Sequence, residues 1–89
     1  VELIYFDGHF DSSPILPGIV QVHWAEAFGR EYFPIQGQFV RLEQVKFQQV
    51  IKPDTLITIE LSYQVKNNKL SFSFNSDQGG HSSGRICFA

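Results

Sequence analysis

The chain has 89 residues, seven basic and nine acidic side chains, a net charge of −2, and one cysteine, Cys87. This length suffices for one domain, and such a chain buries only about 60 to 65 % of its unfolded surface, so a partner subunit would add stability. The chain starts at Val1 and stops where the sequence still reads as a strand. We expect residues 1–89 to form a single domain trimmed at both ends.

Charge and hydropathy exclude several classes of partner. The basic residues are scattered, so the sequence shows no electrostatic footprint for nucleic acid or an anionic membrane. No apolar run approaches the roughly 20 residues of a membrane span, and no signal-peptide pattern opens the chain. A single cysteine excludes an internal disulfide and suits a reducing compartment. These features predict a cytoplasmic protein with no nucleic-acid or membrane partner.

The first half of the chain reads as a strand, a loop and a helix. Residues 1–6 are mostly apolar and are followed by Asp7-Gly8, a turn signal. Residues 9–16 read as loop, and Pro17 suits the first position of a helix. Residues 19–32 carry apolar side chains without strand-like alternation, which predicts a helix of about four turns. Its polar stripe is narrow, so we expect most of its circumference to be buried.

The second half alternates with period two and predicts about four antiparallel strands. After Pro34 and Gly37 the apolar parity changes near Val45 and again near Val50, which indicates bulges in a curved strand. The next strand places alternate residues on one face, and Asn67-Asn68 and Gly79-Gly80 mark the turns that follow. The inward-facing residues are predicted to be Ile57, Ile59, Leu61, Tyr63, Val65, Leu70, Phe72, Phe74, Ile86 and Phe88.

This order of elements predicts an α+β fold. A single curved antiparallel sheet wrapped around one long helix covers the apolar surfaces of both. Residues Trp24 and Phe28, spaced i and i+4, are most simply core residues of that arrangement.

The segment from Gly8 to Gln21 carries the candidate chemistry. His9 lies on the loop, and a histidine can act as a general base near neutral pH. The Pro17-Gly18 step opens the helix and leaves unpaired backbone N–H groups that can hold a developing oxyanion. A base and an oxyanion site therefore lie about nine residues apart.

This order of elements and the motif Gly-His-Phe-x-x-x-Pro-Ile-Leu-Pro-Gly-x-x-Gln together resemble the hot-dog-fold 3-hydroxyacyl-(acyl-carrier-protein) dehydratases. The resemblance spans the whole chain. It is greatest to the small branch linked to aryl-polyene and related fatty-acid-like synthesis, whose helix continues Gln-x-x-Trp-Ala, as residues 21–25 do here. The strand half, including residues 45–47 and 51–54, supports it more weakly.

The resemblance implies a role for each motif residue. His9 matches the base that removes the α-proton of a 3-hydroxyacyl thioester, and Gly18 matches the glycine whose N–H faces the thioester carbonyl. His23 stands where the family carries the glutamate or aspartate that assists departure of the hydroxyl. Phe10, Pro17 and Ile19 flank these positions as substrate-binding residues.

Two departures from the family pattern stand out. Asp11 and Ser12 occupy positions where the family usually has proline and glycine, and His23 replaces a carboxylate. A neutral imidazole is a poor acid, but two histidines in one pocket repel when both are charged, which can leave one neutral base and one cationic acid. Glu26, about 5 Å further along the helix, is an alternative acid.

Each candidate residue also has a purely structural reading. His9 without its motif would be a solvated loop histidine, and His23 could simply pair with Glu26 at i+3. Gly18 suits a helix start on backbone geometry alone, although that geometry also exposes its amide. The spacing of the three histidines and Cys87 matches no zinc pattern, so no metal site is predicted.

The leading hypothesis is a lyase that dehydrates a 3-hydroxyacyl thioester on an acyl carrier protein to the trans-2-enoyl thioester, with no cofactor. The family resemblance implies a homodimer, with His9 of one subunit and His23 of the other in one pocket. Two alternatives stay open: an acyl-binding or assembly subunit that has lost the acid, and a thioesterase on the same fold.

Overall fold

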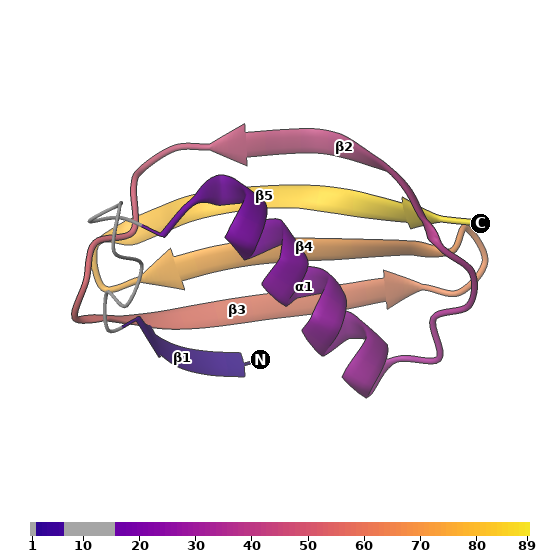
Figure 1. The fold of residues 1–89 in the computed structure, drawn as a ribbon, viewed down its shortest axis with the longest axis horizontal. Coiled ribbons are helices and arrows are strands. Elements are labelled where there is room, and N and C mark those ends of the chain that lie inside the picture. The colour runs from indigo at the N-terminus through magenta and orange to yellow at the C-terminus, as the bar shows by residue number, and fades with distance from the viewer. Residues whose placement is uncertain (1, 7–15) are drawn as a thin grey trace.

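The computed structural model describes residues 2–6 and 16–89 and contains one helix and five strands in that part of the chain (Figure 1). The elements are β1 (Glu2–Phe6), α1 (Gly18–Tyr32), β2 (Phe39–Phe47), β3 (Thr55–Gln64), β4 (Lys69–Ser76) and β5 (Gly79–Phe88). The predicted α+β class and the predicted order of elements are both confirmed.

The five strands form one antiparallel sheet in the order β1-β3-β4-β5-β2. The two strands that flank the helix in sequence therefore lie at opposite edges of the sheet, and the three later strands fill the centre (Figure 1). β2 is a terminal strand, so one side of its backbone has no strand beside it among the described residues.

The core lies between α1 and the central strands. Side chains that alternate along β3, β4 and β5 point to the helix side and are almost fully buried, as the period-two pattern predicts. They include Ile57, Ile59, Leu70, Phe72, Phe74, Ile86 and Phe88. On the helix, Ala25 is fully buried and Gly29 lies so close to β4 that a Cβ there would collide with the Leu70 side chain. The helix is therefore seated on β3 and β4.

The parity changes in the first long strand correspond to a real bulge. The pairing of β2 with β5 shifts register between Phe39 and Arg41 and again between Glu43 and Lys46. Gln44 sits in the second shift with φ 53°, a left-handed conformation that side chains rarely adopt. The predicted bending of this strand is confirmed.

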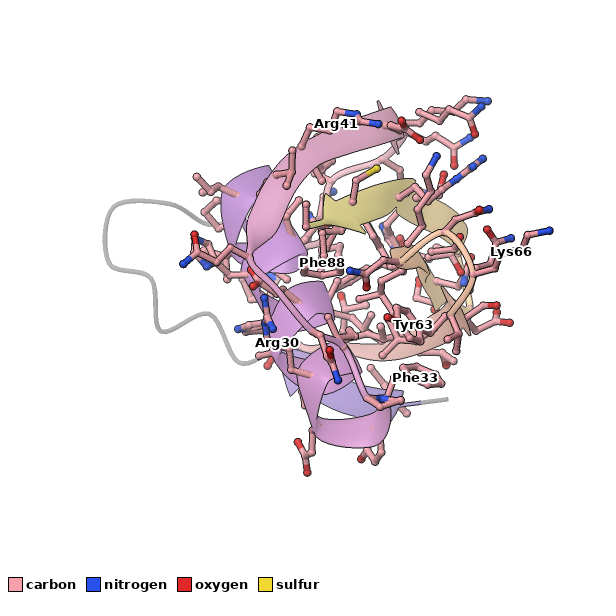
Figure 2. The ribbon with its side chains drawn as sticks, turned by 90° about the vertical axis from the view of Figure 1, so that its right-hand side faces the viewer. Arg30, Phe33, Arg41, Tyr63, Lys66 and Phe88 are labelled. Carbon is pink, nitrogen blue, oxygen red and sulfur yellow. The ribbon has the colours of Figure 1, made fainter. Side chains whose placement is uncertain are left out.

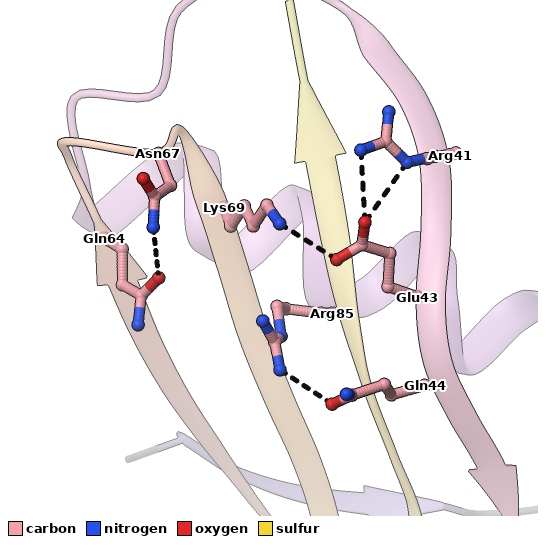
Figure 3. Close-up of polar contacts among 7 residues, drawn as sticks. All are labelled: Arg41, Glu43, Gln44, Gln64, Asn67, Lys69 and Arg85. Carbon is pink, nitrogen blue, oxygen red and sulfur yellow. Dashed lines mark hydrogen bonds and ion pairs between the residues drawn. The ribbon is translucent and has the colours of Figure 1, made fainter.

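On the outer face of the sheet, side chains of β2 form hydrogen bonds with charged side chains of β4 and β5 (Figure 3). Glu43 on β2 accepts hydrogen bonds from Lys69 Nζ at 3.0 Å and from Arg41 Nη2 at 3.1 Å. The hydrogen bond from Lys69, and then that from Arg41, lower the pKa of the Glu43 carboxyl from its ordinary value of 4.5. Arg85 on β5 donates to Gln44 Oε1 at 2.7 Å.

Three details of the sequence reading are wrong. The last turn is formed by Asp77 and Gln78. Gly79 already belongs to β5, and its φ of 106° is one that glycine adopts readily. β3 ends at Gln64, so Val65 lies in the following turn and is 72 % exposed. The predicted turn at Asn67-Asn68 is confirmed, with Asn68 at φ 54°.

The third error concerns the burial of α1. We predicted that most of its circumference would be covered, yet Ile19 is 70 % exposed and Tyr32 is 57 % exposed. The helix packs on β3 and β4, which leaves its other side less covered (Figure 1). Within residues 2–6 and 16–89, no helix has the length and apolar character that a membrane crossing requires.

Candidate active site

The first backbone N–H groups of α1 have no hydrogen-bond partner within the helix. Pro17 caps the helix with ψ 148° and no side-chain hydrogen bond, and its carbonyl accepts from the N–H groups of Val20 and Gln21. The N–H of Gly18 precedes those donors, and the first amides of a helix have no partner within the helix. Among the described residues no acidic side chain occupies the first turn, so the positive end of the helix is left for an outside acceptor.

Gly18 is also the point where β2 approaches the helix. A Cβ at this position would lie 2.9 Å from both Cε1 and Cζ of the Phe47 ring, closer than real side chains come. The ring of Phe47 therefore packs against Gly18, and an added methyl group there would require the ring to shift.

An apolar cavity of about 540 Å³ runs from this point along the gap between α1 and β2. Its lining is Gly18, Ile19, Val22, His23 and Glu26 from the helix, and Phe39, Leu42 and Phe47 from the strand. The size and lining are typical of a site for a small apolar group with a few polar contacts. The cavity brings three of the predicted site positions, Gly18, Ile19 and His23, onto one wall.

His23 is exposed on this wall, and its imidazole makes no hydrogen bond or ion pair with any described residue. The alternative in which His23 pairs with Glu26 is not what the structure contains. Glu26 Oε2 instead accepts from Arg30 Nε at 3.0 Å, one turn further along the helix. The His23 ring is therefore available to a ligand in the cavity.

Three contacts hold Arg30, and the ion pair with Glu26 is one of them. Arg30 Nη2 donates to the carbonyl of Gly37 at 2.9 Å, and the guanidinium lies 4.9 Å from the centre of the Phe88 ring. Figure 2 labels Arg30 and Phe88. A carboxylate held in this way is already an acceptor for a cation, which makes Glu26 less suited than His23 to giving up a proton.

The remaining predicted residues are distributed as follows. Pro17 is the helix cap and not the first helical residue, since its extended ψ ends the preceding segment. Ile19 lines the cavity and is exposed. His9, Phe10, Asp11 and Ser12 lie outside the described residues. The roles predicted for these positions therefore stay predictions.

Sequence reasoning missed the strand side of the cavity. Phe39, Leu42 and Phe47 line it, and each is 39 % exposed or more. Large apolar side chains on an edge strand with a changing parity were the available signal, because a curved edge strand cannot press every apolar residue onto the core. A second cavity of about 300 Å³ shares Gly18 and Phe47 and is otherwise lined mainly by residues 48–50.

His81 and Cys87 belong elsewhere in the fold. His81 is buried, with Nε2 at 2.6 Å from Ser76 Oγ and Nδ1 at 3.1 Å from the carbonyl of Val50. Nδ1 thus holds the segment between β2 and β3, and Nε2 contacts the end of β4. Cys87 is buried on β5 and lines neither cavity.

The fold and the cavity define a hot-dog protein of the dehydratase class: residues 1–85 match the family described as ApeI-like, ApeI dehydratase. The chain belongs to this ApeI-like family.

Solved structures agree with this assignment. The dehydratase heterocomplex ApeI:P from Xenorhabdus doucetiae superposes with a TM-score of 0.85 at 28 % identity, covering 98 % of this chain and 83 % of that one. An uncharacterized protein from Erwinia carotovora gives a TM-score of 0.80 at 30 % identity, covering 97 % and 73 %. A hexameric hotdog-fold thioesterase of Campylobacter jejuni gives 0.66 at 15 % identity, with coverage of 99 % and 79 %, which supports the fold alone. The predicted hot-dog fold is confirmed.

Curated relatives are 3-hydroxyacyl-[acyl-carrier-protein] dehydratases of the FabZ type. The protein of Erythrobacter litoralis is 29 % identical over 75 residues, which are 74 % of this chain and 50 % of that protein. The protein of Chlamydia abortus is 28 % identical over 92 aligned positions, which are 93 % of this chain and 54 % of that protein. This chain thus spans about half the length of the curated relatives it matches.

Proposed function

We propose that this chain dehydrates a 3-hydroxyacyl thioester carried by an acyl carrier protein to the trans-2-enoyl thioester. The observation that carries the proposal is an apolar cavity onto which both the helix start at Gly18 and the imidazole of His23 open, the latter with no partner among the described residues. Membership of the ApeI-like family and similarity to FabZ dehydratases support the same reaction.

The reaction needs three groups. His9 takes the proton from the carbon next to the thioester carbonyl, and the N–H of Gly18 stabilises the negative charge that develops on the carbonyl oxygen. The electron pair left behind forms the carbon–carbon double bond as the bond to the 3-hydroxyl breaks. His23, as an imidazolium, gives the departing hydroxyl a proton, and water leaves. A proton returns from His9 to His23 through solvent, and the substrate undergoes no net oxidation or reduction, so the reaction requires no redox cofactor.

The apolar lining suits the tail of the substrate. With the carbonyl at Gly18, the tail would follow the helix past Val22 toward Glu26 and Phe39. Eight residues of helix span about 12 Å, so the cavity can accept a tail of several carbons. The carrier arm would leave on the other side of Gly18, beside Phe47.

We further propose that the chain acts as a homodimer joined through β2. β2 ends the sheet, and Phe39, Val40, Leu42 and Phe47 leave apolar surface uncovered along it. A second copy added antiparallel at this edge would pair the free backbone groups and cover the open side of the cavity. His9 of one subunit would then act with His23 of the other.

The experiment is enoyl-thioester formation from a panel of 3-hydroxyacyl carrier-protein substrates, with wild type, His9→Ala and His23→Glu in parallel. We expect wild type to turn over, His9→Ala to lose at least about 100-fold in kcat, and His23→Glu, which restores the carboxylate of the family, to remain active. Dimer mass and thermal unfolding serve as controls for folding. Full activity of His9→Ala would refute the mechanism.

A second candidate, an acyl-binding subunit without activity of its own, is favoured by one observation, the histidine at position 23 where the family carries a carboxylate. It predicts no turnover by wild type, acyl-carrier binding that does not need His9, and gain of activity in His23→Glu. Release of free carrier thiol by wild type would instead indicate a thioesterase.

A further inference from the structure

A buried polar pair joins the helix to the sheet directly beneath the candidate site. Gln21 on α1 is 4 % exposed and Ser82 on β5 is 2 % exposed. Ser82 Oγ donates to Gln21 Oε1 at 2.6 Å, so the two side chains satisfy each other across the core. Buried polar groups cost stability unless they are paired, and an apolar pair would fill this space without that requirement. The proposed reaction uses neither residue.

The other end of the Gln21 amide holds the main chain that leads into the helix. Gln21 Nε2 donates to the carbonyl of Leu16 at 3.1 Å. The N–H of Leu16 in turn donates to the carbonyl of Ile51 at 2.8 Å, and the Leu16 side chain is only 1 % exposed. Both backbone polar groups of Leu16 are therefore hydrogen-bonded, the N–H to Ile51 in a distant part of the chain and the carbonyl to the side chain of Gln21.

Leu16 lies between the two groups that the proposed reaction must align. Gly18 follows it by two residues, and His9 precedes it by seven. A residue fixed at Leu16 fixes the direction in which the chain enters the helix start at Gly18. Misplacing a reacting group by about 1 Å can cost on the order of 100-fold in rate.

An amide side chain can make both the bond with Ser82 and the bond with the carbonyl of Leu16. It accepts at one atom and donates at the other, whereas a carboxylate accepts only and a leucine does neither. Gln21→Glu therefore keeps the acceptor for Ser82 but places a second oxygen opposite the carbonyl of Leu16. Protonation of that glutamate would restore a donor toward Leu16.

We propose that Gln21 is a positioning residue of the dehydratase site, which holds the Gly18 amide in place through Leu16. This inference rests on the proposed function. Gln21 is 4 % exposed and borders the second cavity, and it acts on Gly18 through the main chain of Leu16.

The test compares Gln21→Leu and Gln21→Glu with Ile86→Val, a core change on the same strand as Ser82 that lowers stability and leaves the residues that form the Gln21 and Leu16 hydrogen bonds unchanged. We expect kcat of both Gln21 variants to fall about 10- to 100-fold with KM within about twofold, while Ile86→Val keeps its kcat. The kcat of Gln21→Glu should come closer to that of wild type at lower pH, where the glutamate is protonated.

Amide hydrogen exchange separates this inference from the reaction itself. Gln21→Leu should speed exchange at Leu16, whose N–H is bonded to the carbonyl of Ile51, at least about 10-fold beyond the change in Ile86→Val, whether or not the protein turns over. Unchanged exchange at this amide would overturn the positioning role. A rise in KM with kcat intact would also overturn it, because it would mean that Gln21 contacts substrate. Absence of turnover in wild type with faster exchange in the variant would refute only the reaction.

Discussion

The two sides of α1 differ sharply. The side that faces β3 and β4 buries Ala25 and brings Gly29 against Leu70, with no room for an added methyl group. The side that faces β2 leaves Ile19 exposed and encloses a cavity of about 540 Å³. The first side holds the fold together, and the second leaves space for a ligand.

This difference explains why one helix can be both core and candidate active site. Close packing leaves no space for a substrate, so a site on a small domain must be taken from surface that the core does not need. That surface lies between α1 and β2, an edge strand whose pairing with β5 is irregular around Gln44.

The sharpest contrast is between two phenylalanines. Phe74→Ala, on the packed side, should lower the free energy of unfolding by about 3–5 kcal/mol, because Phe74 is fully buried. Phe47→Ala, on the cavity side, should cost less than about 1.5 kcal/mol, because Phe47 is 56 % exposed. Chemical denaturation of both variants measures this, and equal losses would contradict the division of α1 into two sides.

The second prediction concerns His23. His23→Asn should lower kcat about 100-fold while stability changes by less than about 0.5 kcal/mol, since the imidazole has no partner among the described residues. The control is Glu31→Gln on the same exposed helix surface, outside the cavity lining. A His23→Asn variant with full activity would remove His23 from the mechanism.

The third prediction tests the space at the helix start. Gly18→Ala should lower kcat about 10-fold, because the added methyl group would lie 2.9 Å from the Phe47 ring and displace that ring at the helix start. Adding Phe47→Leu should recover part of the loss. Steady-state kinetics of the two single variants and the double variant give the coupling, and strictly additive losses would argue against steric conflict.

The fourth prediction concerns the free edge of the sheet. Val40→Lys on β2 should weaken self-association at least about 10-fold, because Val40 is 51 % exposed and a lysine on an edge strand opposes strand pairing. Sedimentation over a range of concentrations measures the dissociation constant. Val65→Lys, at an exposed turn, is the matched control, and an equal effect of both would locate the contact elsewhere.

The smallest effect is expected for a change of Glu43, which lies on the outer face of the sheet, away from α1. The pKa of Glu43 is lowered in the folded state, so its contribution to stability is present above the ordinary value of 4.5 and is lost as pH falls below it. Glu43→Gln should therefore flatten the acid limb of the stability curve and change little at pH 7. Thermal unfolding across the acid range measures this, and an unchanged acid limb would contradict the role of Lys69 and Arg41.

Much of the fold was predictable from local patterns. The alternation in residues 57–63 and 70–74 predicted strands and their buried faces, because a strand with one face on the core must alternate. The parity change near Val45 predicted the bulge. Burial of α1 was overestimated, since a hydropathy pattern counts apolar residues and cannot tell those that meet a sheet from those that meet a cavity.

The candidate site was predictable only where it is local. The Pro17-Gly18 step and His23 lie within one helical segment, so the motif locates them together. Phe39, Leu42 and Phe47 come to the site from another element, and no spacing along the chain reveals that. The bond between Ser82 and Gln21 joins residues 61 positions apart and depends on how the helix is seated on the sheet.

The sequence by itself determined the order of elements, the buried faces of the central strands and the helix start with its free amide, because these follow from periodicity and backbone chemistry within a few residues. Only the tertiary structure decided which side of α1 is covered, that Glu26 bonds to Arg30 and not to His23, and that β2 and α1 enclose a cavity. Those features depend on the curvature of a sheet whose edge strand is paired with β5, the last strand of the chain.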